Sequence, residues 1–95
     1  MPDSLSDDEL VQLARGGDAA ALGLLLARHQ AGMHAVAFAL LGPGPDADDA
    51  VQDASLIALR RIGDLRDPAA AGAWLRAIVR NACKAILRQR SEERV

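Results

Sequence analysis

The chain carries a cation at every fourth position near its C-terminus: Arg76, Arg80, Lys84 and Arg88. In a helix of 3.6 residues per turn, a step of four residues rotates by only about 40°, so these side chains would form one slowly winding basic stripe. Arg90 would join the edge of this stripe. A row of cations on one helical face can bind the phosphates of a nucleic acid, because each cation neutralises a phosphate and releases a counterion. The spacing therefore indicates a polyanion as a candidate partner.

Two residues that can contact nucleobases stand at the border of this stripe. Trp74 and Asn81 are seven residues apart and would fall on one side of the same helix. An aromatic ring stacks on bases, and a side-chain amide both donates and accepts hydrogen bonds, so the combination predicts binding to unpaired bases. The alternative is that Trp74 belongs to the core and that the stripe is only a solvated face. The pattern alone leaves both interpretations open.

A second candidate surface lies on the preceding, acidic helix. Leu56 and Leu59 fall among the polar side chains of its outer face: Asp49, Gln52, Asp53, Ser55 and Arg60. An apolar centre with a polar rim is typical of a protein docking patch. Alternatively, the two leucines pack under another helix or are exposed singly, as leucines often are.

The residue types that enzymes use are not grouped in a catalytic pattern. His29 and His34 are five residues apart and do not share the i, i+4 face of a helical metal pair. Cys83 stands alone, so no intramolecular disulfide can form and a zinc site would lack its usual ligands. Carboxylates clustered at a helix start usually interact with the helix dipole. We therefore predict a protein that is not an enzyme and that binds no metal, no cofactor and no small-molecule substrate.

Charge and composition indicate the class of fold. Residues 60–95 carry nine basic and four acidic side chains, whereas the whole chain of 95 residues has a net charge of −2. Phe38 and Trp74 are the only aromatic residues, and Ala and Leu are abundant, which favours helices over strands. Length and composition together predict one small all-α domain, a compact bundle of about four helices.

The apolar segments and the single cysteine bear on the location of the protein. The longest apolar stretch, residues 31–41, contains His34 and is well short of the roughly 20 residues that span a bilayer. The acidic N-terminus does not resemble a signal peptide. A lone cysteine suits a reducing compartment. We therefore expect a soluble, cytoplasmic protein that does not contact a membrane.

Capping and breaking residues define the helices that position the two surfaces. Residues 6–9 fit a capping box at the start of a first helix, which would end at Gly16 and Gly17. Asp18 can cap a second helix, which the sequence Gly-Pro-Gly-Pro at residues 42–45 would end.

The third and fourth helices carry the candidate surfaces. The third would open at Pro45 or Asp46 and run to about Ile62. A loop over residues 63–72 re-enters helix near its end, and the fourth helix would run to about Arg90. Beyond it, the last five residues are predicted to be a frayed tail.

Four segments, in order and at suitable spacing, resemble a known family. They are DELVQLARGGD at residues 8–18, DDAVQD at residues 48–53, LRDP at residues 65–68 and WLxxIxxN at residues 74–81. Together they resemble region 2 of bacterial extracytoplasmic-function sigma factors. The resemblance covers nearly the whole chain, roughly residues 6–90.

The resemblance implies RNA polymerase and promoter DNA as partners, and an anti-sigma factor as a third. In such proteins the acidic helix docks on the clamp helices of the RNA polymerase β′ subunit, and an anti-sigma factor is a further expected partner. The residues implied to bind polymerase are Asp49, Gln52, Asp53, Ser55, Leu56 and Leu59. The sigma factor would thus bring the polymerase to a promoter at the start of transcription.

The resemblance also implies contact with opened promoter DNA. The loop and the basic helix would meet the minus ten element, where the nontemplate strand is single-stranded and a base is flipped into a pocket formed by residues 65–71. The residues implied to bind DNA are Leu65, Arg66, Trp74, Arg76, Arg80, Asn81, Lys84 and Arg88. Capturing a base outside the stack offsets the unstacking cost of a few kcal/mol.

The chain departs from the family pattern in two ways. Family members commonly have an aromatic residue shortly before the Trp, whereas residues 68–73 hold none, so we expect weak stacking during melting or stacking by Trp74 alone. A working member also carries region 4, a second helical domain that reads the minus thirty-five element. We expect residues 1–95 to be a single region 2 domain excised from a longer protein, with its core at about residues 6–90 and residues 91–95 as a tail or the start of a linker to region 4. The alternative is a shortened relative that recruits upstream contacts in another way.

Two other functions compete with this interpretation. The chain could be a helical module that binds only protein, for instance an adaptor or a decoy for the polymerase or for an anti-sigma factor. A helix-turn-helix protein that reads duplex DNA comes third, because the loop at residues 63–72 is longer than the short turn of that motif.

Overall fold

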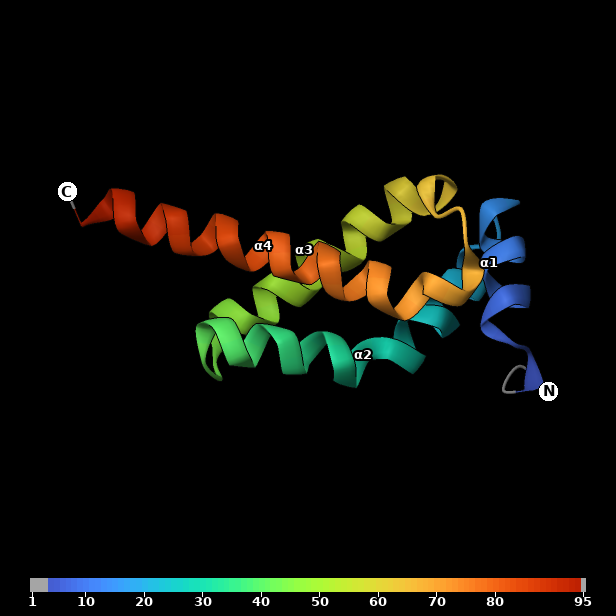
Figure 1. Ribbon diagram of the computed structural model, residues 1–95, viewed down its shortest axis with the longest axis horizontal. Coiled ribbons are helices and arrows are strands. Elements are labelled where there is room, and N and C mark those ends of the chain that lie inside the picture. Colours follow the sequence, from blue (N-terminus) through green and yellow to red (C-terminus); the bar gives the residue numbers. More distant parts are fainter. Residues whose placement is uncertain (1–3, 95) are drawn as a thin grey trace.

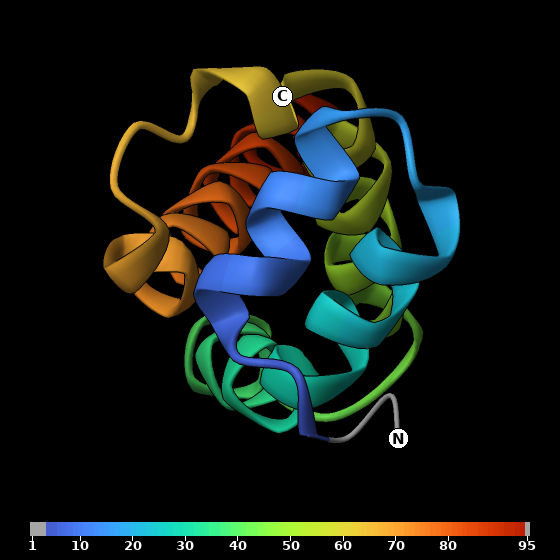
Figure 2. The ribbon, with the colours of Figure 1, turned by 90° about the vertical axis from the view of Figure 1, so that its right-hand side faces the viewer.

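The computed structural model describes residues 4–94, which form a bundle of helices (Figure 1). The elements are α1 (Asp7–Arg15), α2 (Ala19–Leu41), α3 (Pro45–Arg61), the 3-10 turns η2 (Ile62–Asp64) and η3 (Pro68–Ala70), and α4 (Ala71–Glu93). Viewed along the long axis, α1 lies across one end of the three longer helices (Figure 2). The predicted all-α bundle of four helices is confirmed.

The ends of α1 and the start of α2 follow the predicted capping. The Ser6 hydroxyl accepts a hydrogen bond from the Glu9 amide at 3.1 Å, and the Glu9 carboxylate accepts one from the Ser6 amide at 3.2 Å. The chain then turns at Gly17, whose φ of 101° suits glycine. Asp18 caps α2 by accepting a hydrogen bond from the Ala21 amide at 3.0 Å.

The second helix, α2, is 23 residues long and by length and composition alone could cross a membrane. The sequence predicted that no apolar segment is long enough to span a bilayer. This prediction is corrected, because the apolar helix begins at Ala19 and not at residue 31. In the fold, α2 packs against the three other α-helices and supplies Leu22, Leu25, Met33 and Ala37 to the core. The apolar character of α2 is accounted for in part by this packing.

The core consists of two clusters that meet near the middle of the bundle. One lies between α2, α3 and α4, and its α3 side is made of fully buried alanines: Ala47, Ala50, Ala54 and Ala58. Such small side chains let neighbouring helices approach closely. The other cluster joins α1, the first half of α2 and the loop before α4 through residues such as Leu10, Leu25 and Ile62. Trp74 packs against both clusters and so links them.

The fourth helix is longer than predicted. It continues to Glu93, so residues 91–93 are helical rather than a frayed tail. One physical reason is the contact between the side chains of Gln89 and Glu93, one turn apart, at 3.4 Å. Val95, the end of the predicted tail, lies outside the described residues. Figure 1 shows the C-terminal part of α4 extending beyond the rest of the bundle.

Candidate functional site

The basic stripe on α4 faces solvent along its whole length. Arg76, Arg80, Lys84 and Arg88 are all exposed. They wind along the helix on the side away from Leu75, Val79 and Cys83, which are fully buried. At a rise of 1.5 Å per residue the stripe is about 18 Å long. Within residues 4–94 none of these four cations forms an ion pair, so their charges are available to a polyanion.

Arg90 does not belong to this stripe, which corrects the sequence prediction. Its guanidinium pairs with the carboxylate of Asp46 at the start of α3. This ion pair ties the far end of α4 to the first turn of α3. It also means that one acid of the acidic helix is already neutralised within the protein.

The two residues at the border of the stripe differ in exposure. Asn81 is exposed, so its amide can bind a partner. Trp74 is only partly exposed and packs against both core clusters. Its ring therefore contributes mainly to the core, which is the alternative that the pattern left open.

The loop before α4 is held in place by two of its own side chains. Leu65 is only 4% exposed and lies in the N-terminal core cluster, so its side chain faces away from any partner. The Asp67 carboxylate accepts a hydrogen bond from the Ala69 amide at 3.0 Å and caps η3. Arg66, between them, is exposed. Of the two predicted DNA contacts in this loop, only Arg66 therefore has a side chain that a partner can reach.

The outer face of α3 combines leucines with acids. Leu56 and Leu59 are 47% and 53% exposed, so they do not pack under another helix. Asp49, Gln52 and Asp53 are exposed on the preceding turns of α3, and Arg60, next to Leu59, is exposed as well. The Ser55 hydroxyl donates to the Val51 carbonyl at 2.9 Å and is thus used by its own helix. The result is an apolar centre with a largely acidic rim.

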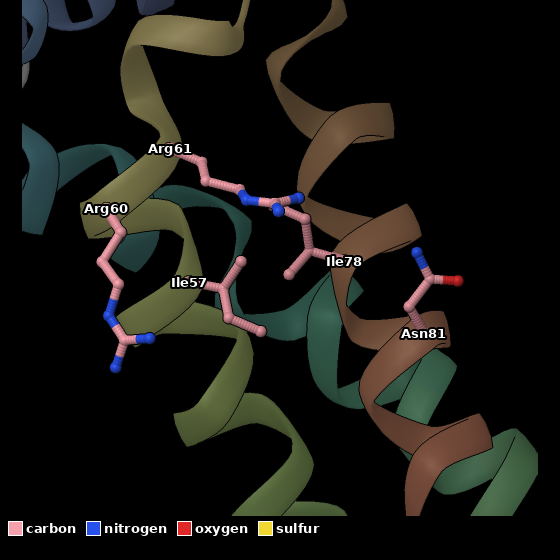
Figure 3. A pocket seen from close by; sticks show the side chains of 5 residues that line it. All are labelled: Ile57, Arg60, Arg61, Ile78 and Asn81. Atoms are coloured by element: carbon pink, nitrogen blue, oxygen red, sulfur yellow. The ribbon is translucent and has the colours of Figure 1, made fainter.

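A groove between α3 and α4 separates this acidic face from the basic stripe. One cavity of about 270 Å³ lies in it, lined by Ile57, Arg60, Arg61, Ile78 and Asn81 (Figure 3). A neighbouring cavity of about 450 Å³ shares Ile57, Arg60 and Asn81 and is also lined by Asp53, Leu56 and Gln89. The sequence prediction missed Ile57, Arg61 and Ile78 as members of a site, because a helical wheel treats each helix alone and a groove exists only where two helices pack.

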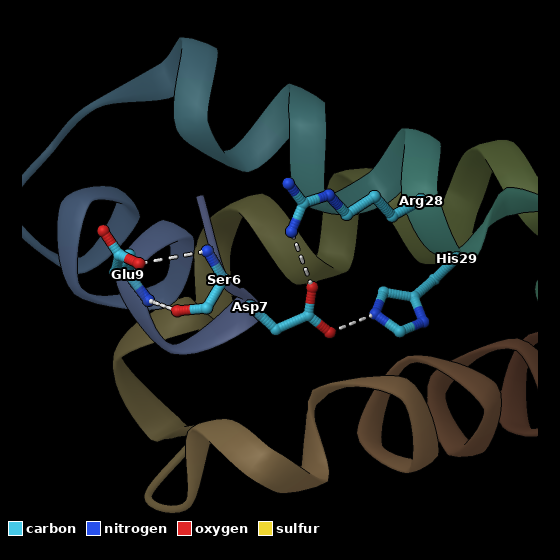
Figure 4. Close-up of polar contacts among 5 residues, drawn as sticks. All are labelled: Ser6, Asp7, Glu9, Arg28 and His29. Atoms are coloured by element: carbon cyan, nitrogen blue, oxygen red, sulfur yellow. Dashed lines mark hydrogen bonds and ion pairs between the residues drawn. The ribbon is translucent and has the colours of Figure 1, made fainter. Parts of the chain in front are cut away.

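A polar cluster where α1 meets α2 fixes the two helices together (Figure 4). The Asp7 carboxylate lies 2.7 Å from His29 Nε2 and 3.3 Å from an Arg28 guanidinium nitrogen. Partial burial alone would raise the pKa of the Asp7 carboxyl, but hydrogen bonds and charges from His29 and Arg28 outweigh it and hold this pKa below its ordinary value. The sequence prediction considered His29 only as a metal ligand and missed this role.

His29 also lies against the first turn of α4. A Cβ on Gly72 would stand 3.0 Å from His29 Cε1 and 3.2 Å from a guanidinium nitrogen of Arg76. Glycine at this position therefore allows the start of α4, and with it the first cation of the stripe, to approach α2 closely.

Metal ligands and reactive thiols are not gathered into a site in residues 4–94. No group of three or more His, Cys, Asp or Glu side chains in this range could hold a metal ion. Cys83 is fully buried, and burial raises the pKa of its thiol, so the thiol stays protonated and unreactive.

Comparison with known proteins gives one family and two curated relatives. The family model described as Sigma-70 region 2 matches residues 25–93. The relatives are two proteins named ECF RNA polymerase sigma factor SigM, from Mycobacterium tuberculosis strains ATCC 25618 / H37Rv and ATCC 35801 / TMC 107 / Erdman, which are 43% and 42% identical to the chain over 84 residues. The alignments cover 88% of the chain and 43% of each relative, so the chain spans less than half of their length. No solved structure matches the chain.

Proposed function

The chain belongs to the Sigma-70 region 2 family, as a region 2 domain of the extracytoplasmic-function type, and from this premise we propose that it bridges RNA polymerase and promoter DNA at the start of transcription. The observation that carries the proposal is the pairing of two unlike exposed faces on adjacent helices. The outer face of α3 has two exposed leucines among acids, whereas α4 has four cations without ion pairs within residues 4–94.

The outer face of α3 is the proposed polymerase-binding surface. Leu56 and Leu59 would bury apolar area against the clamp helices of the β′ subunit, with Asp49, Gln52 and Asp53 as the polar rim. This division suits an interface, because affinity comes mainly from a few desolvated central residues and the surrounding polar contacts exclude water. Ser55 supports the surface only indirectly, because its hydroxyl bonds to the backbone of α3.

The exposed cations of α4, together with Arg66 and Asn81, are the proposed DNA-binding surface. The stripe would follow the phosphates of the single-stranded nontemplate strand at the minus ten element. Asn81 would bind a base edge, which is hidden in a stacked duplex and accessible only after opening. Trp74 would offer at most the exposed part of its ring, and the side chain of Leu65 is excluded from the surface because it is buried.

The loop that precedes α4 offers no aromatic ring to stack on opened bases, which fits weak melting of promoter DNA. Family members commonly have an aromatic residue shortly before the Trp. Here that part of the chain is η3, Pro68–Ala70, and the start of α4, and residues 68–73 contain no aromatic side chain. We therefore propose that opened DNA is held mainly by phosphate contacts and base-edge hydrogen bonds, with little stacking.

The decisive experiment measures binding of the chain to a fragment that carries the β′ clamp helices. Leu56→Asp and Asp53→Arg should each weaken this binding about tenfold or more, because an isolated charge or a reversed charge is then placed in the interface. Leu13→Asp is the matched control, since Leu13 is 44% exposed on α1 and is not among the residues proposed to contact the clamp helices. Circular dichroism should show the same helix content in all variants. Equal affinity of the wild type and both α3 variants would remove the polymerase assignment.

The same chain can also be tested as a module that binds only protein. Such a module would bind the clamp fragment but would show no salt-dependent affinity for single-stranded DNA. The proposed bridge requires both activities.

A further inference from the structure

We propose that this chain associates with a second copy of itself, with the projecting C-terminal end of α4 of one copy docked in a groove between α1 and the start of α2 of the other. The two surfaces are unlike, so the contact is head-to-tail. The self-association does not depend on the proposed function. It covers part of the basic stripe, however, and therefore competes with the proposed binding of DNA.

The groove between α1 and α2 has an apolar lining and an acidic rim. A cavity of about 420 Å³ lies there, and Leu13, which is 44% exposed, also lines an adjoining cavity of about 430 Å³. The charged residues that line the two cavities are all acidic: Asp8, Glu9 and Asp18. The apolar residues that line the first cavity are Leu5, Leu10, Leu13, Ala20, Ala21 and Leu24. Such a groove suits a partner that presents an apolar side chain among cations.

The C-terminal end of α4 has this complementary character. Leu87 is 39% exposed. Arg80, Lys84 and the capping residue Arg94 are exposed and lie within about 60° of Leu87 around the helix. The glutamates at residues 92–93 are rotated away from Leu87 by at least about 120°. The side of α4 that carries Leu87 is therefore apolar at its centre and basic at its edges.

The groove and the end of α4 belong to the same chain but cannot meet within one molecule. Figure 1 shows α1 and the C-terminus of α4 at the two ends of the long axis, along which the molecule extends over 49 Å. Because α4 is one continuous helix over Ala71–Glu93, it cannot fold back onto its own α1. A second copy supplies the missing surface without any further protein.

The lengths of the two surfaces agree. Residues 87–94 span about 12 Å, and the nine residues of α1 span about 13 Å. A contact of this length is smaller than stable interfaces, which bury about 1,200 Å² or more, so we expect a dissociation constant on the order of 100 μM. Leu87 is rotated by only about 20° from Arg80, so the docked end hides the C-terminal part of the stripe.

The test is sedimentation equilibrium of the 95-residue chain, at concentrations from about tenfold below to about tenfold above the expected dissociation constant. The average mass should rise above the 10.0 kDa of one chain as the concentration increases. Leu13→Asp and Leu87→Asp should each weaken the association about tenfold or more, because each places a charge in the apolar contact. Leu40→Asp, at a residue that is 41% exposed on α2, is the matched control and should associate like the wild type. Circular dichroism should show the same helix content in all variants.

A mixture of the two disruptive variants distinguishes a head-to-tail contact from a symmetric one. The Leu87→Asp chain keeps an intact groove, and the Leu13→Asp chain keeps an intact α4 end, so together they can form one contact and no more. We expect the mixture to form a 1:1 complex with about twice the mass of one chain, although neither variant associates by itself. Raising the NaCl concentration from about 50 to about 500 mM should weaken this contact about fivefold, because salt screens the charges of its rim.

Three results overturn the proposal: a chain that stays monomeric over the whole concentration range, an association that neither variant weakens, or a mixture that is no heavier than its separate components. Single-stranded DNA separates the proposal from the proposed function. Displacement of the second copy by DNA supports both. If the mixture forms its complex but the chain binds no DNA, the self-association is supported and the DNA-binding function fails. If DNA binds the stripe without displacing the second copy, the docked side of α4 is wrong and the proposal is overturned.

Discussion

The outer faces of α3 and α4 lie on either side of one groove, yet they are built from different side chains. Both helices bury small or branched apolar residues on their inner sides, such as Ala54 on α3 and Val79 on α4. Outside, α3 presents leucines within an acidic rim, whereas the face of α4 that carries the stripe is a row of cations. An apolar centre gains affinity by desolvation, and a row of cations gains it by releasing counterions, so the two faces should respond to different perturbations.

Leu75→Ala should give the largest loss of unfolding free energy, and it should weaken the binding by both faces together. Leu75 is fully buried where α4 packs on α2 and α3, so its truncation leaves a cavity that costs about 3 kcal/mol of unfolding free energy. Urea denaturation followed by circular dichroism measures this loss. Leu87→Ala, on the exposed surface of the same helix, should change the unfolding free energy by less than about 0.5 kcal/mol.

The binding consequence of Leu75→Ala follows from the shared core. As urea unfolds the variant, affinity for the clamp fragment and affinity for single-stranded DNA should disappear over the same range of urea concentration. If one activity persisted in urea that abolishes the other, the two faces would not depend on a common fold.

Arg80→Ala should change the salt dependence of DNA binding by α4 without changing the binding of the clamp fragment by α3. The plot of log affinity for single-stranded DNA against log salt should flatten by about 0.7 to 1 unit, because one phosphate contact and its counterion are lost. Affinity for the clamp fragment should not change. The slopes are measured by fluorescence anisotropy at several salt concentrations.

Arg90→Ala is the matched control for this prediction. It removes a cation from the same helix, but one that is already paired with Asp46. The slope should therefore stay the same. A slope that changed as much for Arg90→Ala as for Arg80→Ala would show that net charge, and not the stripe, governs DNA binding.

Local signals in the sequence predicted the helices well, because helix ends depend on nearby residues. The capping box at Ser6 and the cap at Asp18 both form within three residues of sequence. The alternation of cations and apolar residues on α4 likewise predicted which side is exposed, since it depends only on helical periodicity. The end of α4 was placed too early, because its last turn is supported by a side-chain contact between Gln89 and Glu93 that composition alone does not reveal.

Contacts between distant residues could not be predicted in the same way. The pairing of Arg90 with Asp46 joins residues 44 positions apart, so periodicity wrongly assigned Arg90 to the stripe. The burial of Leu65 depends on how the loop folds onto α1 and α2, and the cavity at Arg61 depends on the packing of α3 against α4. Each of these features is set by the tertiary arrangement, which a single sequence does not specify position by position.

Asp7→Asn should give the smallest effect and should leave both faces intact. The lowered pKa of Asp7 means that its ionised form stabilises the fold at pH values above the ordinary carboxyl pKa of 3.8, and that this contribution is lost as the pH falls through the lower value in the folded protein. Because the Asp7 side chain is about one-third exposed, solvent screening limits the effect to about 0.5 kcal/mol.

The comparison that tests this prediction is urea denaturation of the wild type and Asp7→Asn at several pH values. The wild type should be more stable near neutral pH, and the difference should shrink as the pH falls below about 3.8, because protonation of Asp7 then removes its charge in the wild type as well. Asp8→Asn, at an exposed neighbour in the same turn of α1, should show a smaller difference in stability at neutral pH. Both variants should bind the clamp fragment and single-stranded DNA like the wild type, because neither Asp7 nor Asp8 belongs to the leucine face of α3 or to the basic stripe of α4. A loss of DNA affinity in Asp7→Asn alone would instead show that His29, which touches both Asp7 and the start of α4, transmits the position of α1 to the basic stripe.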